Sequence, residues 1–180
     1  MSGVLGGLIA AFPTPVTGAF ESIATLTPTS GTSVSFTSIP STYASLQIRG
    51  VLYSDGNLQR FRLNSDSGNN YVNHFLDGNS LSTVSAGAST AQPYFGLQYG
   101  SRLDGGLAFI IDIHDYASTT KNKTVKMFYG FDNNGTNVTA VTLQSGLWLS
   151  TAAITSVSVL SSGTGFATGC EFSLYGIKGA

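Results

Sequence analysis

The chain has 180 residues, of which 42% are hydrophobic and only 9% are charged, and its formal net charge at pH 7 is −1. This length suits a single domain, and a high apolar content with little net charge excludes an intrinsically disordered chain. Eight Lys and Arg residues against nine Asp and Glu residues leave no concentrated basic surface, which argues against nucleic-acid binding.

The first thirty residues predict an extended N-terminal arm. Glycine and proline recur too often in residues 1–30 for a stable helix, although a frayed or cleaved terminus would have the same composition. The apolar stretch at the start follows no Lys or Arg and is shorter than a membrane span, so we expect neither a signal peptide nor a membrane anchor. Four apolar side chains of the arm are candidates for contact with another protein: Leu5, Leu8, Ile9 and Phe12.

Residues 31–180 predict a single β-sandwich domain, because short alternating segments are separated by turn residues. In residues 58–64, Phe61 and Leu63 alternate with two arginines, which is the period-two pattern of a half-buried antiparallel strand. Similar alternation occurs in residues 32–39 and 44–53.

The second half of the chain continues this pattern. Residues 107–111 are apolar throughout, so we expect a central strand that is covered on both faces, and residues 123–129 predict its hairpin partner. Further strands are expected in residues 137–149, 152–160 and 170–177, and no segment has sustained helical spacing. The sequence therefore predicts an all-β, antiparallel β-sandwich, with a jelly roll as the favoured topology.

No recognisable catalytic motif occurs, so we expect a protein that is not an enzyme and that needs no cofactor or metal. Asp112 and His114 share a strand face and could form a metal site or an acid–base pair. A third ligand at a recognisable spacing is missing, and ordinary hydrogen bonding is the favoured interpretation. Four loop aspartates do not follow the calcium-loop pattern: Asp55, Asp66, Asp77 and Asp132.

Three other groups of residues have both a structural and a functional interpretation. Lys121, Lys123 and Lys126 predict a solvated hairpin end, with anion binding as the alternative. Cys170 is the single cysteine, so no intrachain disulfide is possible and a buried thiol is expected. A set of aromatic residues could form a sugar-binding platform or a subunit contact, although strand packing is favoured: Tyr94, Phe95, Tyr99, Tyr116 and Tyr129.

Three stretches resemble a group of bacteriophage virion structural proteins. Residues 20–50 contain an F-x-x-I opening and an S-I-P-x-x-Y-x-x-L-x-I-R strand, and residues 155–179 contain a terminal F-S-L-Y-G-I. Residues 111–124 are similar to the D-Y-x-x-T-x-K-x-K-T hairpin of this group. The resemblance implies a jelly-roll-like β-sandwich that often assembles as a homotrimer. Members of the group are capsid decoration (cement) proteins and parts of tail fibres or spikes.

The resemblance leads us to expect a capsid decoration protein, since 180 residues are few for a fibre shaft with a head. Such a protein is made in the host bacterial cytoplasm, binds the major capsid protein lattice as a homotrimer, and stabilises the head from the virion surface. The alternative is a tail fibre or spike module that binds host surface glycan through Tyr94, Tyr99 or Trp148. Neither nucleic acid nor a membrane is an expected partner. From the residues alone, we add the hypothesis that the apolar arm reaches a neighbouring subunit.

Overall fold

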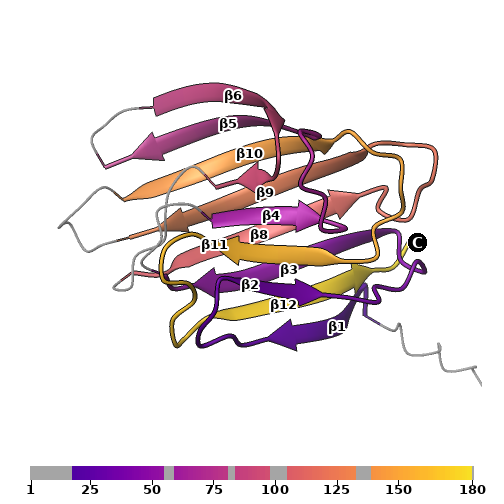
Figure 1. Ribbon diagram of the computed structural model, residues 1–180, viewed down its shortest axis with the longest axis horizontal. Helices are drawn as coiled ribbons and strands as arrows, with labels where there is room; N and C mark the ends of the chain where they lie inside the picture. The colour runs from indigo at the N-terminus through magenta and orange to yellow at the C-terminus, as the bar shows by residue number, and fades with distance from the viewer. Residues whose placement is uncertain (1–17, 55–58, 81–83, 98–104, 133–138, 180) are drawn as a thin grey trace, which may run out of the picture.

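Two antiparallel sheets make up the computed structural model, which describes residues 18–54, 59–80, 84–97, 105–132 and 139–179 (Figure 1). Within these ranges the chain forms twelve strands and no helix, which confirms the predicted all-β sandwich. The larger sheet contains eight strands in the order β1 (Phe20–Leu26), β12 (Glu171–Ile177), β3 (Ser45–Leu52), β8 (Leu107–His114), β9 (Lys123–Phe131), β10 (Ala140–Trp148), β5 (Tyr71–Asn79) and β6 (Val84–Gln92). The smaller sheet has the order β2 (Ser33–Phe36), β11 (Val157–Ser161), β4 (Gln59–Leu63) and β7 (Phe95–Gly96).

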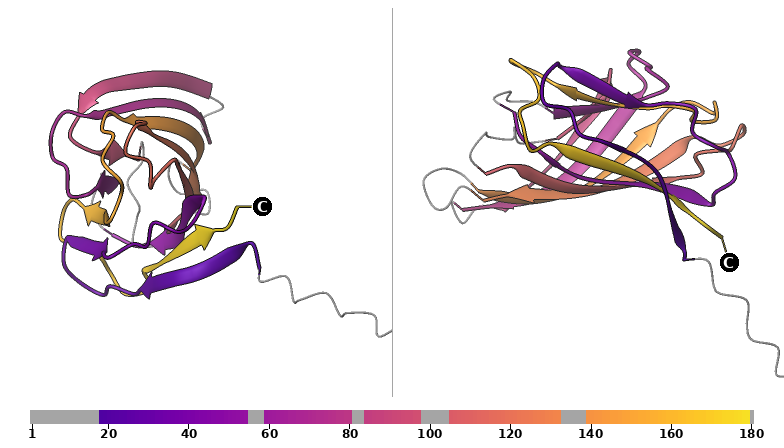
Figure 2. Two further views of the ribbon diagram at one scale, coloured as in Figure 1. Left: turned by 90° about the vertical axis from the view of Figure 1, so that its right-hand side faces the viewer. Right: turned by 90° about the horizontal axis from the view of Figure 1, so that it is seen from below.

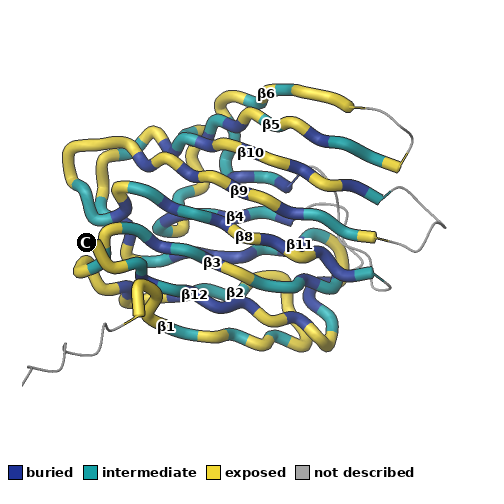
Figure 3. Tube along the Cα trace, turned by 180° about the vertical axis from the view of Figure 1, so that it is seen from behind, coloured by how far each residue is buried: buried dark blue, intermediate teal, exposed yellow. Residues whose placement is uncertain are grey.

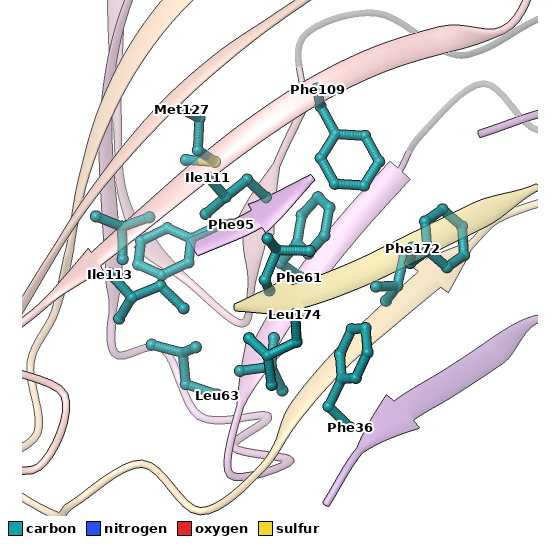
Figure 4. Close-up of a cluster of buried hydrophobic side chains, with 14 of the residues drawn as sticks. Phe36, Phe61, Leu63, Phe95, Phe109, Ile111, Ile113, Met127, Phe172 and Leu174 are labelled. Carbon is teal, nitrogen blue, oxygen red and sulfur yellow. The ribbon is translucent and has the colours of Figure 1, made fainter. Parts of the chain in front are cut away.

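The core lies between the two sheets. Seen along the strands, the larger sheet curves around the core and the smaller sheet closes the open side of the curve (Figure 2, left). Phe61 and Leu63 of β4 are buried, which confirms the alternation predicted for this segment. Phe61 meets Phe109 of β8 with the ring centres 5.4 Å apart, and Phe109 lies 5.8 Å from Phe172 of β12 (Figure 4). These rings therefore connect the two sheets through the apolar interior.

The sandwich begins earlier in the chain than the sequence predicts. The predicted arm covers residues 1–30, but Phe20–Leu26 form β1, which pairs with β12 along its length. Alternation in this segment is weak because β1 is an edge strand, and its side chains are at most half-buried. The prediction of an arm is thus wrong for residues 20–26. Residues 1–17 lie outside the described residues.

The expectation that residues 107–111 are covered on both faces is also wrong. Leu107, Phe109 and Ile111 point into the core and are buried, whereas Ala108 and Ile110 point outward and are exposed. Figure 3 looks onto the larger sheet from behind and shows this alternation of buried and exposed positions along β8, β9 and β10. No other described strand lies over this outer face.

Candidate interaction surface

The outer face of the larger sheet carries a line of exposed apolar side chains that crosses four neighbouring strands. The strand register places Ile110 opposite Phe128, Phe128 opposite Leu143, and Leu143 opposite Leu76. Their exposed fractions are 40%, 54%, 58% and 50%, in this order. We call these four residues the apolar row. Contiguous exposed apolar side chains are typical of a surface that contacts another molecule.

Two of the strands that contribute to the apolar row, β5 and β10, turn apolar side chains to solvent and polar side chains toward the core. In β10, Val141 and Leu143 point to solvent, whereas Thr142 and Gln144 point inward and are buried. A half-buried strand ordinarily turns its apolar side chains toward the core. β5 has the same inversion: Leu76 is exposed on the outer face, and the polar residues Asn73 and Asp77 are buried on the inner face.

Hydrogen bonds stabilise the polar residues beneath the apolar row. The side-chain amide nitrogen of Gln144 donates to Asn73 Oδ1 and to the carbonyl of Gly96, both at 3.0 Å, and Gln144 Oε1 accepts from the Tyr129 hydroxyl at 2.8 Å. Asp77 accepts a hydrogen bond of 2.7 Å from Ser85. Buried polar groups with partners of this kind are tolerated at little cost. The apolar side chains of β5 and β10 are therefore free to face outward.

Two hollows lie beside the apolar row on the outer face. The larger one has a volume of about 690 Å³, and Ile110, Phe128 and Val141 line it on one side. Arg49 and Tyr175 line the same hollow on β3 and β12. The smaller one, of about 380 Å³, lies on the other side and is lined mainly by residues of β5 and β10. The apolar row thus contributes side chains to both depressions.

A polar cluster occupies the part of the same face that is nearest β1. The Arg49 guanidinium lies 4.8 Å from the centre of the Phe20 ring and 5.1 Å from that of Tyr175. Its Nε donates to Gln47, and the Gln47 amide donates to Asp112 at 2.6 Å. Cation–π contacts hold Arg49 in place, so the cluster forms a fixed polar edge to the apolar surface.

The predicted pair of Asp112 and His114 is not brought together as an acid–base site. Asp112 accepts from Gln47, as described above, and His114 Nε2 is buried with no hydrogen-bond partner among the described residues. In the described ranges, no three His, Cys, Asp or Glu residues are grouped so that they could hold a metal ion.

Asp66 has a structural role in the loop between β4 and β5. Its carboxylate accepts hydrogen bonds from Trp148 Nε1 at 2.7 Å, from Asn70 Nδ2 at 2.9 Å and from the backbone N–H of Gly68 at 2.8 Å. Burial raises the pKa of the Asp66 carboxyl, but these hydrogen bonds outweigh it and leave the pKa below its ordinary value. Asp132 is exposed, and Asp55 lies outside the described residues.

The three lysines of the predicted hairpin end do not share one environment. Lys121 is exposed and forms an ion pair of 3.1 Å with Asp115, and Lys126 points to solvent from β9. Lys123 is fully buried, so the prediction of a solvated side chain is wrong for this residue. Burial lowers the pKa of its ammonium group, and the charge of Asp115 opposes this change.

Among the residues that the structure describes, the aromatic side chains proposed for glycan binding do not form a platform. Phe95, Tyr116 and Tyr129 are buried, so packing in the core is the correct interpretation for these three, and Trp148 is buried as well. Tyr94 is half-buried, with the Arg60 guanidinium 4.5 Å from its ring centre, and Tyr99 lies outside the described residues.

Cys170 is buried, as expected. The Tyr53 N–H donates to its sulfur at 3.2 Å, and the thiol donates to the Tyr53 carbonyl at 3.2 Å. The candidate contact residues Leu5, Leu8, Ile9 and Phe12 lie outside the described residues.

Sequence reasoning missed the apolar row. The signal that could have found it lies in residues 140–148. There Val141 and Leu143 alternate with the polar residues Thr142 and Gln144, while the ends of the strand are apolar at both kinds of position. A polar residue at every second position fits either orientation of the strand, and the apolar set is ordinarily assigned to the core.

In comparisons with known proteins, no protein-family model, no curated protein and no solved structure matches the chain. Among the described residues, no helix is long and apolar enough to cross a membrane.

Proposed function

We propose that the chain is a bacteriophage capsid decoration protein, which associates as a homotrimer, binds the major capsid protein lattice and stabilises the head on the virion surface. The observation that carries the proposal is the apolar row on strands with inverted polarity. A face that turns Leu143 and Phe128 to solvent gains stability when another protein covers it, and the hydrogen bond from Gln144 to Asn73 fixes this orientation of β10. Catalysis and cofactors have no part in this role.

Residues 20–50, 111–124 and 155–179 resemble phage virion structural proteins, and this resemblance supports a homotrimer that binds to a phage capsid. Strand order supports the jelly-roll part of the proposal. β1, β12, β3 and β8 are neighbours in the larger sheet, and β2, β11, β4 and β7 are neighbours in the smaller sheet. When these eight strands are taken in chain order, most connections cross from one sheet to the other, as in a jelly roll. The hairpins β5-β6 and β9-β10 are then insertions that widen the larger sheet.

The glycan-binding alternative has less support. It depends on an exposed aromatic platform, and Trp148 is buried with its indole N–H donated to Asp66. We therefore retain the decoration role alone.

Peptide mass spectrometry of purified virions from the phage that encodes the chain tests the proposal. The expected result is hundreds of copies per particle, in a fixed ratio to the major capsid protein. A handful of copies would indicate a tail component, and absence from the particle would contradict a virion role altogether.

A further inference from the structure

The apolar row has a polar border on one side. The next outward residues of the same four strands are Asp112, Lys126, Ser145 and His74, which the register also places side by side. On the other side the next outward residues are Ala108, Gly130, Val141 and Gly78, so the surface there carries no charge. Successive outward residues of a strand lie about 7 Å apart, so the row itself is a strip with the width of one extended segment. A second sheet packed over the whole face would remove Lys126 and Asp112 from water, which is costly for charged groups.

The N-terminal arm has the composition and the length that this strip requires. Residues 1–17 contain no charged side chain, and their apolar residues include Leu5, Leu8, Ile9 and Phe12. Extended backbone from Leu5 to Phe12 spans about 23 Å, which is enough to cover the four residues of the strip, since three strand spacings from β8 to β5 amount to about 14 Å. We propose that residues 5–12 of one copy of the chain lie across the apolar row of a neighbouring copy.

The direction of β1 indicates a neighbouring copy rather than the same chain. The register aligns Phe20 with His114, whereas Thr25, near the other end of β1, is aligned with Ile110 of the apolar row. The chain that precedes Phe20 therefore enters the sheet from the end that is remote from its own apolar row.

A contact between the arm of one copy and the apolar row of the next joins two different surfaces. Contacts of this kind form a closed ring when the repeated rotation from copy to copy returns to the first copy. The inference deepens the self-association part of the proposed function and rests on it. It adds the segment and the surface that make the contact.

Pairs of introduced cysteines in the full chain test this contact. Ala11→Cys places a thiol in the arm, Ser145→Cys places one beside Leu143, and the buried Cys170 stays in every variant. Co-expressed chains, one with a short mass tag, are treated with a short bis-maleimide. We expect a mixed dimer from Ala11→Cys with Ser145→Cys. The matched control, Ala11→Cys with Thr119→Cys on the exposed β8–β9 connection, is expected to give none.

Addition of Leu143→Ser to the Ser145→Cys chain tests the apolar contact itself. The yield should fall about tenfold, because burial of a leucine side chain contributes affinity of this order. An unchanged yield would overturn the role of the apolar row.

The double variant Ala11→Cys/Ser145→Cys and light scattering separate the remaining outcomes. A cross-link within single chains would show that the arm covers its own row and would overturn the inference. An oligomer that gives no arm-to-row cross-link would also overturn the inference and leave self-association intact. A single-chain mass without cross-links would contradict both the inference and the proposed homotrimer.

Discussion

At the scale of single residues, Lys123 shows how a charged group can be part of the interior. Its Nζ donates to three backbone carbonyls, those of Ser118 at 2.8 Å, Lys121 at 2.6 Å and Thr151 at 3.2 Å. An ammonium group has three donors, so this set satisfies it fully. The contacts fasten the β8–β9 connection to the segment that follows β10.

We expect Lys123→Met to lower the free energy of unfolding by about 2 kcal/mol, because buried carbonyls lose a charged donor. Lys121→Met is the matched control. The exposed ion pair that it removes contributes less than about 0.5 kcal/mol. Urea unfolding of the two variants measures the difference, and equal stabilities would show that the buried contacts are energetically neutral.

A second prediction at this scale concerns Asp66 and pH. The pKa of its carboxyl in the folded chain lies below the ordinary value of about 4, so the stabilisation is present above pH 4 and is lost as the pH falls through the lower folded pKa. Asp66→Asn removes the titrating group. We expect the loss of stability between pH 6 and pH 2 to be smaller in this variant than in the wild type (a window of roughly four pH units around the ordinary pKa). Glu171→Gln, which removes an exposed carboxyl, is the control, and identical pH profiles for all three proteins would refute the role of Asp66.

At the scale of strands, β5 and β10 bury polar side chains on their inner face, next to the buried rings of Tyr71 and Trp148. β5 and β6 extend past the smaller sheet, so their inner face has less apolar surface to pack against (Figure 1). Asn73 and Asp77 of β5 are nevertheless buried, and each has a hydrogen-bond partner. The inversion is therefore a consequence of where these strands lie in the sheet.

Two adjacent residues of β10 test the inversion directly. We expect Gln144→Ala to destabilise the single chain by about 2 kcal/mol, since three hydrogen bonds to buried groups are lost. Leu143→Ser should change the stability by less than about 0.5 kcal/mol, because the leucine is already exposed. Urea unfolding at a concentration where the chains are monomeric measures both. A larger effect at Leu143 than at Gln144 would show that β10 has the ordinary orientation.

The sequence could predict those strands in which local alternation decides the orientation. Phe61 and Leu63 are buried as expected, because the two arginines that alternate with them face outward. The orientation of β10 could not be predicted, since it depends on hydrogen bonds from Gln144 to Asn73 and Gly96, which are distant in sequence. The apolar row could not be predicted either, because its alignment requires the register of four strands.

At the scale of the whole molecule, the protein is a sandwich of unequal sheets. Eight strands in the larger sheet face four in the smaller one, so the larger sheet has a broad outer face without a described partner. The exposed apolar residues of β8, β9, β10 and β5 gather on this face, and polar residues border them on one side. We therefore expect the face to determine how the copies associate.

Sedimentation velocity of the full chain and of the double variant Phe128→Ser/Leu143→Ser measures this association. We expect the wild type to sediment at three times the chain mass of 18.7 kDa, and the variant to sediment as a single chain with an unchanged circular-dichroism spectrum. A wild type that stays at the mass of one chain at every concentration, or a folded variant that retains the trimer mass, would contradict the claim that this face is the interaction surface.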